Sequence, residues 1–169
     1  MGVVSVEEAL NLRESHIKSP ILAFDVCDSQ FAREIIEYKI TPVVSSYEQL
    51  KALKPFVKSA PLKIHLKFNT GMNRLGFEVE QAQDLSDKLD SHFQVEGICT
   101  HFINGEDADI NEGFSAQQIR AFARVESAFA KQNPIVHYLN SAAMIVGAIK
   151  PQENILSKKQ NVGCRPGVS

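Results

Sequence analysis

The fold is decided by the stretch Lys67-Phe68-Asn69-Thr70-Gly71-Met72-Asn73-Arg74-Leu75-Gly76-Phe77. Its first three residues end a run, residues 62–69, in which apolar and polar residues alternate. The two kinds of side chain therefore lie on opposite faces of a strand. An ordinary half-exposed strand has this pattern, and so does a barrel strand whose polar groups converge at the barrel mouth. Two glycines and an arginine follow directly, where parallel α/β proteins build their sites, and this favours the barrel strand.

Strand-like and helix-like runs alternate on both sides of this stretch. Strands are expected at residues 2–5, 20–24, 40–45, 62–69, 93–102, 135–140 and 161–167. Helices are expected at 6–15, from Ser29 onward, at 46–53, 78–89 and 115–131, the last with a buried stripe of Ile119, Phe122, Val125 and Phe129. This alternation indicates a parallel sheet with right-handed crossovers. The predicted fold class is α/β: an incomplete (β/α)8 TIM-like barrel with about seven strands, the first strand missing.

Length and composition narrow the class of protein. The 169 residues suffice for one domain with a substantial core, and the formal net charge of −2 does not suit a nucleic-acid-binding protein. No apolar run has the length of a membrane span, and the N-terminus carries no signal segment. Cys27, Cys99 and Cys164 are few and widely spaced, which is typical of reduced thiols. We therefore expect a cytoplasmic protein with no nucleic-acid or membrane partner.

No metal site is expected. His65 and His137 could suggest one, but no two histidines of the chain have the close spacing of zinc ligands. Both are interpreted as structural residues. The same interpretation applies to the aromatic residues of the 115–131 helix, whose spacing is that of a buried core face.

Three segments resemble, in the same order, the motifs of the alanine racemases. They are Thr70-Gly71-Met72-Asn73-Arg74-Leu75-Gly76-Phe77, Thr100-His101-Phe102, and Asn140-Ser141-Ala142-Ala143 with Arg165-Pro166-Gly167. The resemblance covers essentially all of residues 1–169. It implies a partial N-terminal barrel domain that binds pyridoxal 5'-phosphate, an internal fragment without the C-terminal β-domain of that family.

The resemblance also implies an activity. Alanine racemases convert L-alanine to D-alanine for peptidoglycan with two bases, one being the lysine that holds the cofactor as a Schiff base. The other is a tyrosine from the C-terminal domain of the partner subunit in a homodimer. Neither base matches a position in residues 1–169, so we expect the intact protein to be the racemase and the isolated chain to be inactive. The expected substrate is a small amino acid, alanine or serine.

The resemblance assigns site residues one by one. Ser141, Gly167 and Val168 correspond to the phosphate-binding positions, and Arg165 to the arginine at the pyridine nitrogen. Arg74 corresponds to the arginine near the phenolic oxygen of the cofactor, with Lys67 at a position often carbamylated in the family. His101 corresponds to the histidine that orients the tyrosine base. Arg74 and His101 are thus supporting catalytic residues.

Each motif alone has a simpler explanation. His101 fits a core histidine, Asn140-Ser141 a helix cap, Arg165-Pro166-Gly167 an ordinary turn, and Arg74 a surface arginine. Two differences from the family pattern stand out: Asn69 is found where aspartate is common, and the link over residues 144–164 is longer than usual. A cofactor-binding homologue without racemase activity, or a truncated non-catalytic product, is the alternative.

Overall fold

The computed structural model describes residues 1–25, 29–103, 113–139 and 162–164. The chain forms two compact units. The first comprises Met1–Leu66 with Asp90–Glu96, and the second comprises Lys67–Leu89 with Gly97–Ser169. Strands β4 (Leu62–Asn69) and β6 (Phe93–Cys99) begin in the first unit and end in the second.

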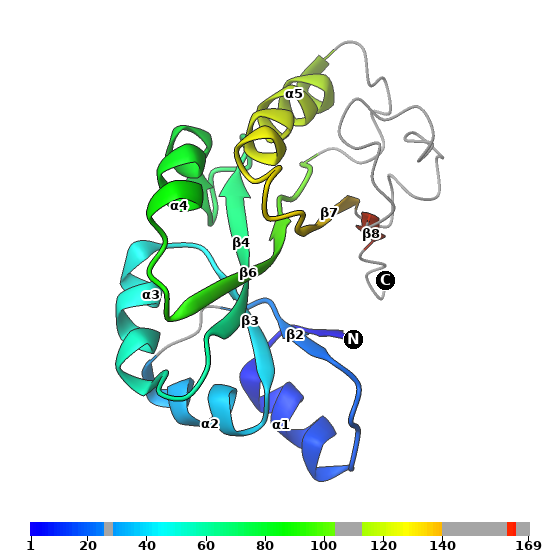
Figure 1. The fold of residues 1–169 in the computed structure, drawn as a ribbon. Coiled ribbons are helices and arrows are strands. Elements are labelled where there is room, and N and C mark those ends of the chain that lie inside the picture. The colour runs from blue at the N-terminus through cyan, green and yellow to red at the C-terminus, as the bar shows by residue number, and fades with distance from the viewer. Residues whose placement is uncertain (26–28, 104–112, 140–161, 165–169) are drawn as a thin grey trace. The chain divides into compact units, whose positions relative to one another are not determined.

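The first unit repeats strand and helix three times before β4 begins (Figure 1). Its elements are β1 (Gly2–Val3), α1 (Val6–Glu14), β2 (Ile21–Ala23), the 3-10 turn η1 (Ser29–Phe31), α2 (Ala32–Glu37), β3 (Ile40–Val44), α3 (Tyr47–Leu53) and the 3-10 turn η2 (Lys54–Phe56). All of its strand pairs are parallel, with Ile21 opposite Ile40 and Val43 opposite His65. Parallel neighbours require a crossover between them, and each helix supplies one.

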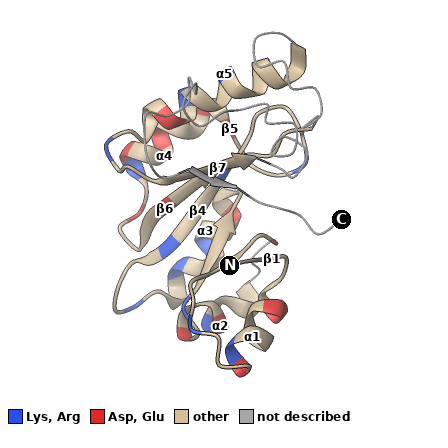
Figure 2. Ribbon diagram, turned by 90° about the vertical axis from the view of Figure 1, so that its right-hand side faces the viewer, with Lys and Arg blue, Asp and Glu red and all other residues tan. Residues whose placement is uncertain are grey.

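Serine caps fix where two of these helices begin. The Ser5 hydroxyl accepts a hydrogen bond from the Glu8 amide at 3.2 Å, and the Ser46 hydroxyl accepts one from the Gln49 amide at 3.3 Å. Such caps satisfy amide donors that have no partner within the first turn. Charges of both signs lie along α1 and α4 (Ala82–Lys88) (Figure 2), with at least one acidic residue in the first turn and a basic residue in the last turn of each. This order suits the helix dipole.

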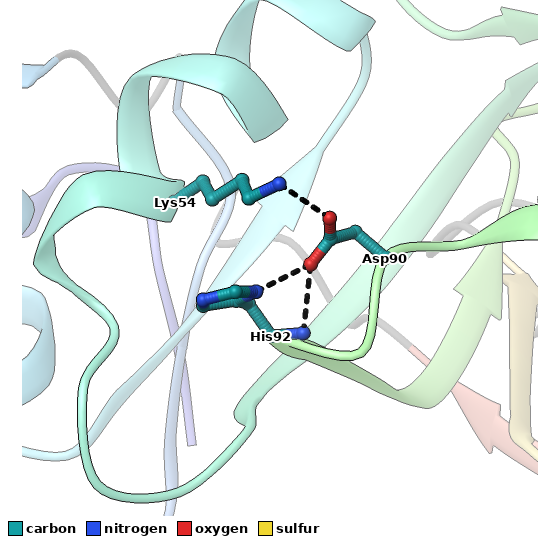
Figure 3. Close-up of polar contacts among 3 residues, drawn as sticks. All are labelled: Lys54, Asp90 and His92. Carbon is teal, nitrogen blue, oxygen red and sulfur yellow. Dashed lines mark hydrogen bonds and ion pairs between the residues drawn. The ribbon is translucent and has the colours of Figure 1, made fainter.

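An ion-pair cluster in the first unit joins η2 to the turn before β6 (Figure 3). One carboxylate oxygen of Asp90 pairs with Lys54, and the other accepts hydrogen bonds from the backbone amide and the ring of His92. The hydrogen bond from Lys54, followed by those from His92, holds the pKa of Asp90 well below its ordinary value. Asp90 is therefore ionised at neutral pH, and its bonds to Lys54 and His92 hold the turn that precedes β6 against η2.

The second unit contains the ends of β4 and β6 and the elements that follow them (Figure 1). These are β5 (Phe77–Glu78), the 3-10 turn η3 (Val79–Gln81), α4, α5 (Gly113–Ala128), β7 (Ile135–Leu139) and β8 (Val162–Cys164). Six aromatic rings pack in its core: Phe68 against Phe77 and Phe129, and Tyr138 against Phe102 and Phe122. Their centroid separations, 5.6 to 6.1 Å, are those of tilted and edge-to-face pairs.

The predicted fold class is confirmed. Hydrogen-bonded strand neighbours follow the order β1-β2-β3-β4-β6-β7-β8, and every predicted strand corresponds to one of these. The short strand β5, which pairs with β4, was not predicted, because two residues are too few for a recognisable alternation. Within the described part of the chain, no helix is both long and apolar enough to cross a membrane.

Candidate functional site

Polar side chains gather where β4 and β6 end, within the second unit. Lys67 lies in the last part of β4 and is buried, with 8% of its surface exposed. Thr70 follows β4 directly, and Thr100 and His101 follow β6. β4 and β6 are neighbouring strands, and the carboxyl ends of such strands are where parallel α/β proteins place ligands.

Asn69 organises the turn that carries Arg74. Its side-chain oxygen accepts hydrogen bonds from the amides of Gly71 at 3.1 Å and Asn73 at 2.9 Å. Its side-chain nitrogen donates to Asn73 Oδ1 at 2.9 Å and to Glu78 Oε1 at 3.2 Å. An asparagine side chain can both accept and donate hydrogen bonds. Here it bonds to backbone and side-chain groups of the turn and so stabilises the turn.

Gly76 closes the same turn against the backbone of β4. Its φ of +137° lies in the region that side chains rarely adopt. A Cβ at this position would lie 2.6 Å from the amide nitrogen of Asn69 and 2.7 Å from the carbonyl carbon of Phe68. The turn can therefore return onto the strand end only with glycine at position 76.

A buried hydrogen-bond network joins the two strand ends to α5. The hydroxyls of Thr70 and Thr100 lie 2.7 Å apart, and the Thr100 hydroxyl donates to the Phe68 carbonyl at 3.0 Å. Gln118 of α5 donates to the Thr70 hydroxyl at 3.1 Å and to the His101 carbonyl at 3.2 Å. Gln118 is not among the site residues that the sequence motifs predict. The available signal was a glutamine next to the buried stripe of a predicted helix.

Lys67, Arg74 and His101, three of the predicted site residues, all lie in the second unit. Lys67 is buried, His101 is partly exposed, and Arg74 lies exposed in the turn. The other predicted site residues, Ser141, Arg165, Gly167 and Val168, lie outside the described residues. Their roles, like those of Lys67, Arg74 and His101, stay predictions.

The histidines interpreted as structural lie within strands. His65 is buried in β4, and burial lowers its pKa to about 4 despite the opposing effect of the Glu96 carboxylate 3.8 Å away. It is therefore neutral at pH 7. His137 is buried in β7. Among the residues that the structure describes, no three histidine, cysteine or acidic side chains gather as metal ligands.

A comparison with known families decides the relationship. The sequence profile of the alanine racemase N-terminal domain matches residues 1–167. The chain belongs to the alanine racemase family. Among its relatives, it is 35% identical over 153 residues to alanine racemase 2 of Clostridium acetobutylicum and 36% identical over 149 residues to the alanine racemase of Streptococcus pneumoniae. The aligned residues make up 85% of this chain in both cases, but only 38% and 39% of those relatives.

Solved alanine racemases share the fold. The enzyme from Enterococcus faecalis superposes with a TM-score of 0.80 at 29% identity, over 99% of this chain and 44% of that one. The enzyme from Clostridium difficile 630 gives the same TM-score at 25% identity, over 99% and 43%. The chain thus has the strand and helix order of part of an alanine racemase barrel, which agrees with an incomplete (β/α)8 barrel.

Proposed function

We propose that this chain is the cofactor-binding barrel domain of a pyridoxal-phosphate-dependent alanine racemase. The observation that carries the proposal is the arrangement of Lys67, the Arg74 turn and His101 at the ends of two neighbouring parallel strands. These are the positions at which the sequence resembles the racemase motifs. A family relationship alone would not carry the proposal, since one fold can host several chemistries.

The described residues fit an anionic cofactor. Pyridoxal phosphate has a phosphate and a phenolic oxygen that carry negative charge, and both need basic or amide donors. Arg74 is exposed on a turn held by Asn69 and closed by Gly76, so its guanidinium is available to an anionic ligand. When bound, the cofactor withdraws electrons from the α-carbon of an amino acid and makes its proton acidic.

Each residue then has a distinct role. Arg74 binds the phenolic oxygen, and a carbamylated Lys67 would place a negative charge that pairs with and orients the Arg74 guanidinium. Ser141, Gly167 and Val168 bind the phosphate. Arg165 donates to the pyridine nitrogen and keeps it unprotonated, because a guanidinium does not release its proton.

The proton transfers need two bases that we place outside residues 1–169. One is the lysine that holds the cofactor, and the other is a tyrosine from the partner subunit of a homodimer. His101 orients that tyrosine by a hydrogen bond. The chain spans about 40% of the length of its relatives, with values of 38%, 40% and 40% for three of them, which leaves room for both groups.

The test uses the complete gene product. Purified with pyridoxal phosphate, it should convert L-alanine to D-alanine, measured by coupling to a D-amino-acid oxidase, with L-serine as the competing substrate. Borohydride reduction and peptide mapping should place the cofactor on a lysine outside residues 1–169. Cofactor binding without racemisation would support the non-catalytic homologue instead, and a label on Lys67 would refute the assignment of its role.

A matched pair of variants tests the site itself. Arg74→Gln should lower kcat at least about tenfold, because the charged donor to the cofactor is lost. Arg124→Gln removes an equally charged but highly exposed arginine of α5, whose partner is Glu80 at 3.4 Å, and should leave kcat unchanged. Equal effects of the two substitutions would count against the proposed role of Arg74.

A further inference from the structure

Gln118 is fully buried in α5 and bonds to three groups at the strand ends. Its Nε2 donates to the Thr70 hydroxyl at 3.1 Å and to the His101 carbonyl at 3.2 Å, and its Oε1 accepts from the Ile103 amide at 3.1 Å. Its exposed fraction is 0%. A backbone carbonyl needs a donor and a backbone amide needs an acceptor, so His101 and Ile103 fix which end of the side-chain amide is oxygen.

The hydroxyl protons of the network can then be assigned. A threonine hydroxyl has one proton to donate, and that of Thr100 goes to the Phe68 carbonyl at 3.0 Å. In the 2.7 Å contact between the two hydroxyls, Thr70 is therefore the donor. Donation runs in one direction, from Gln118 to Thr70, to Thr100 and to the β4 backbone. The amide nitrogen of Gln118 cannot accept, so this direction cannot reverse.

Gln118 acts where the strand ladder has ended. The parallel register of β6 with β7 ends with Cys99 opposite His137, and His101 lies two residues further on. The bonds from Gln118 hold the backbone on both sides of Phe102, at the His101 carbonyl and the Ile103 amide. Buried backbone groups beyond a ladder need such partners, and a side chain on a long helix can supply them rigidly.

We propose that Gln118 is a positioning residue for His101. Through Thr70 and Thr100 it also links the end of β4 to the end of β6, so that the Arg74 turn and His101 keep a fixed separation. This inference rests on the proposed function, in which His101 orients the tyrosine that transfers a proton. Gln118 itself touches neither substrate nor cofactor. Its effect should appear in the chemical step more than in binding.

The principal test compares two glutamine-to-methionine substitutions in the complete, cofactor-loaded protein. Gln118→Met keeps the length and bulk of the side chain but removes its hydrogen bonds. It should lower kcat for L-alanine at least about tenfold, with KM and cofactor content changed less than about twofold, since small displacements of reacting groups cost that much. The control, Gln132→Met, removes bonds of a second glutamine to the Ser86 hydroxyl and carbonyl in α4, and should leave kcat unchanged.

A purely structural role predicts a different result. In that case Gln118→Met would lower the melting temperature while the folded protein kept its wild-type kcat, and this outcome overturns the proposal. If the variant fails to fold, Thr70→Val and Thr70→Ser decide instead. Serine keeps the hydroxyl and should retain kcat within about twofold, whereas valine should lose activity as Gln118→Met does. Equal kcat values for the serine and valine variants contradict the network.

Hydrogen exchange separates this inference from the proposed function. Gln118→Met removes the acceptor of the Ile103 amide, so exchange at that amide should become faster than in the wild type and in Gln132→Met. Mass spectrometry measures this whether or not the protein racemises alanine. A wild type without racemase activity refutes the proposed function and with it the role of Gln118 in the reaction. Unchanged exchange at Ile103 refutes the anchoring itself.

Discussion

The side-chain nitrogen of Asn69 lies 3.2 Å from the Glu78 carboxylate and donates a hydrogen bond to it. The bond closes the turn after β4, because Asn69 ends that strand and Glu78 ends the short strand β5 beside it. An aspartate in place of Asn69 would have no proton to donate at neutral pH. The hydrogen bond to Glu78 therefore depends on the side-chain amide of Asn69.

Replacing Asn69 by aspartate should weaken the turn. Asn69→Asp keeps the acceptor for the Gly71 and Asn73 amides, but it loses the donor to Glu78 and to Asn73 Oδ1 and places two carboxylates next to each other. We expect the free energy of unfolding to fall by about 1 kcal/mol, measured by urea denaturation. In a Glu78→Gln background the cost should be smaller, because glutamine can donate to the new carboxylate. Equal costs in both backgrounds would show that the contact contributes nothing.

Glycine is required at position 76 for two separate reasons, its positive φ and its contact with the backbone. A comparison with Gly113 distinguishes their effects. Gly76→Ala meets both a positive φ and a collision with the β4 backbone. Among the residues that the structure describes, and apart from its own helix and chain neighbours, Gly113→Ala meets only a positive φ, of +83°, with no atom within 4 Å of the new Cβ. We expect Gly76→Ala to cost well over 2 kcal/mol and Gly113→Ala about 1 kcal/mol. Thermal unfolding of both variants measures this. Similar losses would mean that the turn can move away from Asn69.

The strands and helices were predictable because their signals are local. The alternation over 62–69 and the apolar stripe of α5 each lie within one element. These signals gave the element order and, with the parallel pairing rule, the fold class. Strand β5 was not predicted because no hydrophobic alternation marks its two residues. The Asn69–Glu78 hydrogen bond and the close approach of Gly76 to the backbone bring them beside β4.

The site was predictable only where a motif marks it. Lys67, Arg74 and His101 were named from their motifs, and the structure puts them at the strand ends. Gln118 was not, since its partners Thr70 and His101 are 48 and 17 residues away in the chain and no local pattern links them. The role of a buried glutamine can be inferred only once the packing of α5 against the ends of β4 and β6 is known. That packing is tertiary structure, which no local sequence pattern contains.

Arg13 should contribute more to stability than an exposed arginine. Its guanidinium donates to the carbonyls of Tyr38 at 2.9 Å, Ile17 at 2.7 Å, Ser19 at 2.8 Å and Lys39 at 3.2 Å. It thereby ties α1 to the segments that lead into β2 and β3. Lysine cannot reach this fan of acceptors with one ammonium group. Arg13→Lys should lower the free energy of unfolding by about 1–2 kcal/mol.

The control for Arg13 is Arg124→Lys. Arg124 makes one exposed ion pair with Glu80, and its replacement should change stability by less than about 0.5 kcal/mol. Chemical denaturation of both variants at the same pH gives the comparison. If Arg13→Lys is as stable as Arg124→Lys, the carbonyl acceptors of Arg13 are satisfied equally well by water.

His65 should make the protein less stable as the pH falls. Burial lowers its pKa from the ordinary 6.5 to about 4, so between these values the unfolded chain binds a proton that the folded chain does not. Its contribution to the free energy of unfolding is therefore intact above pH 6.5 and falls steadily toward pH 4, by up to about 3 kcal/mol. Denaturation at a series of pH values measures this slope. His65→Gln has no group that titrates in the interval, so the difference in stability between wild type and variant should change with pH by that amount. Parallel curves would mean that His65 binds its proton equally well in the folded and the unfolded chain.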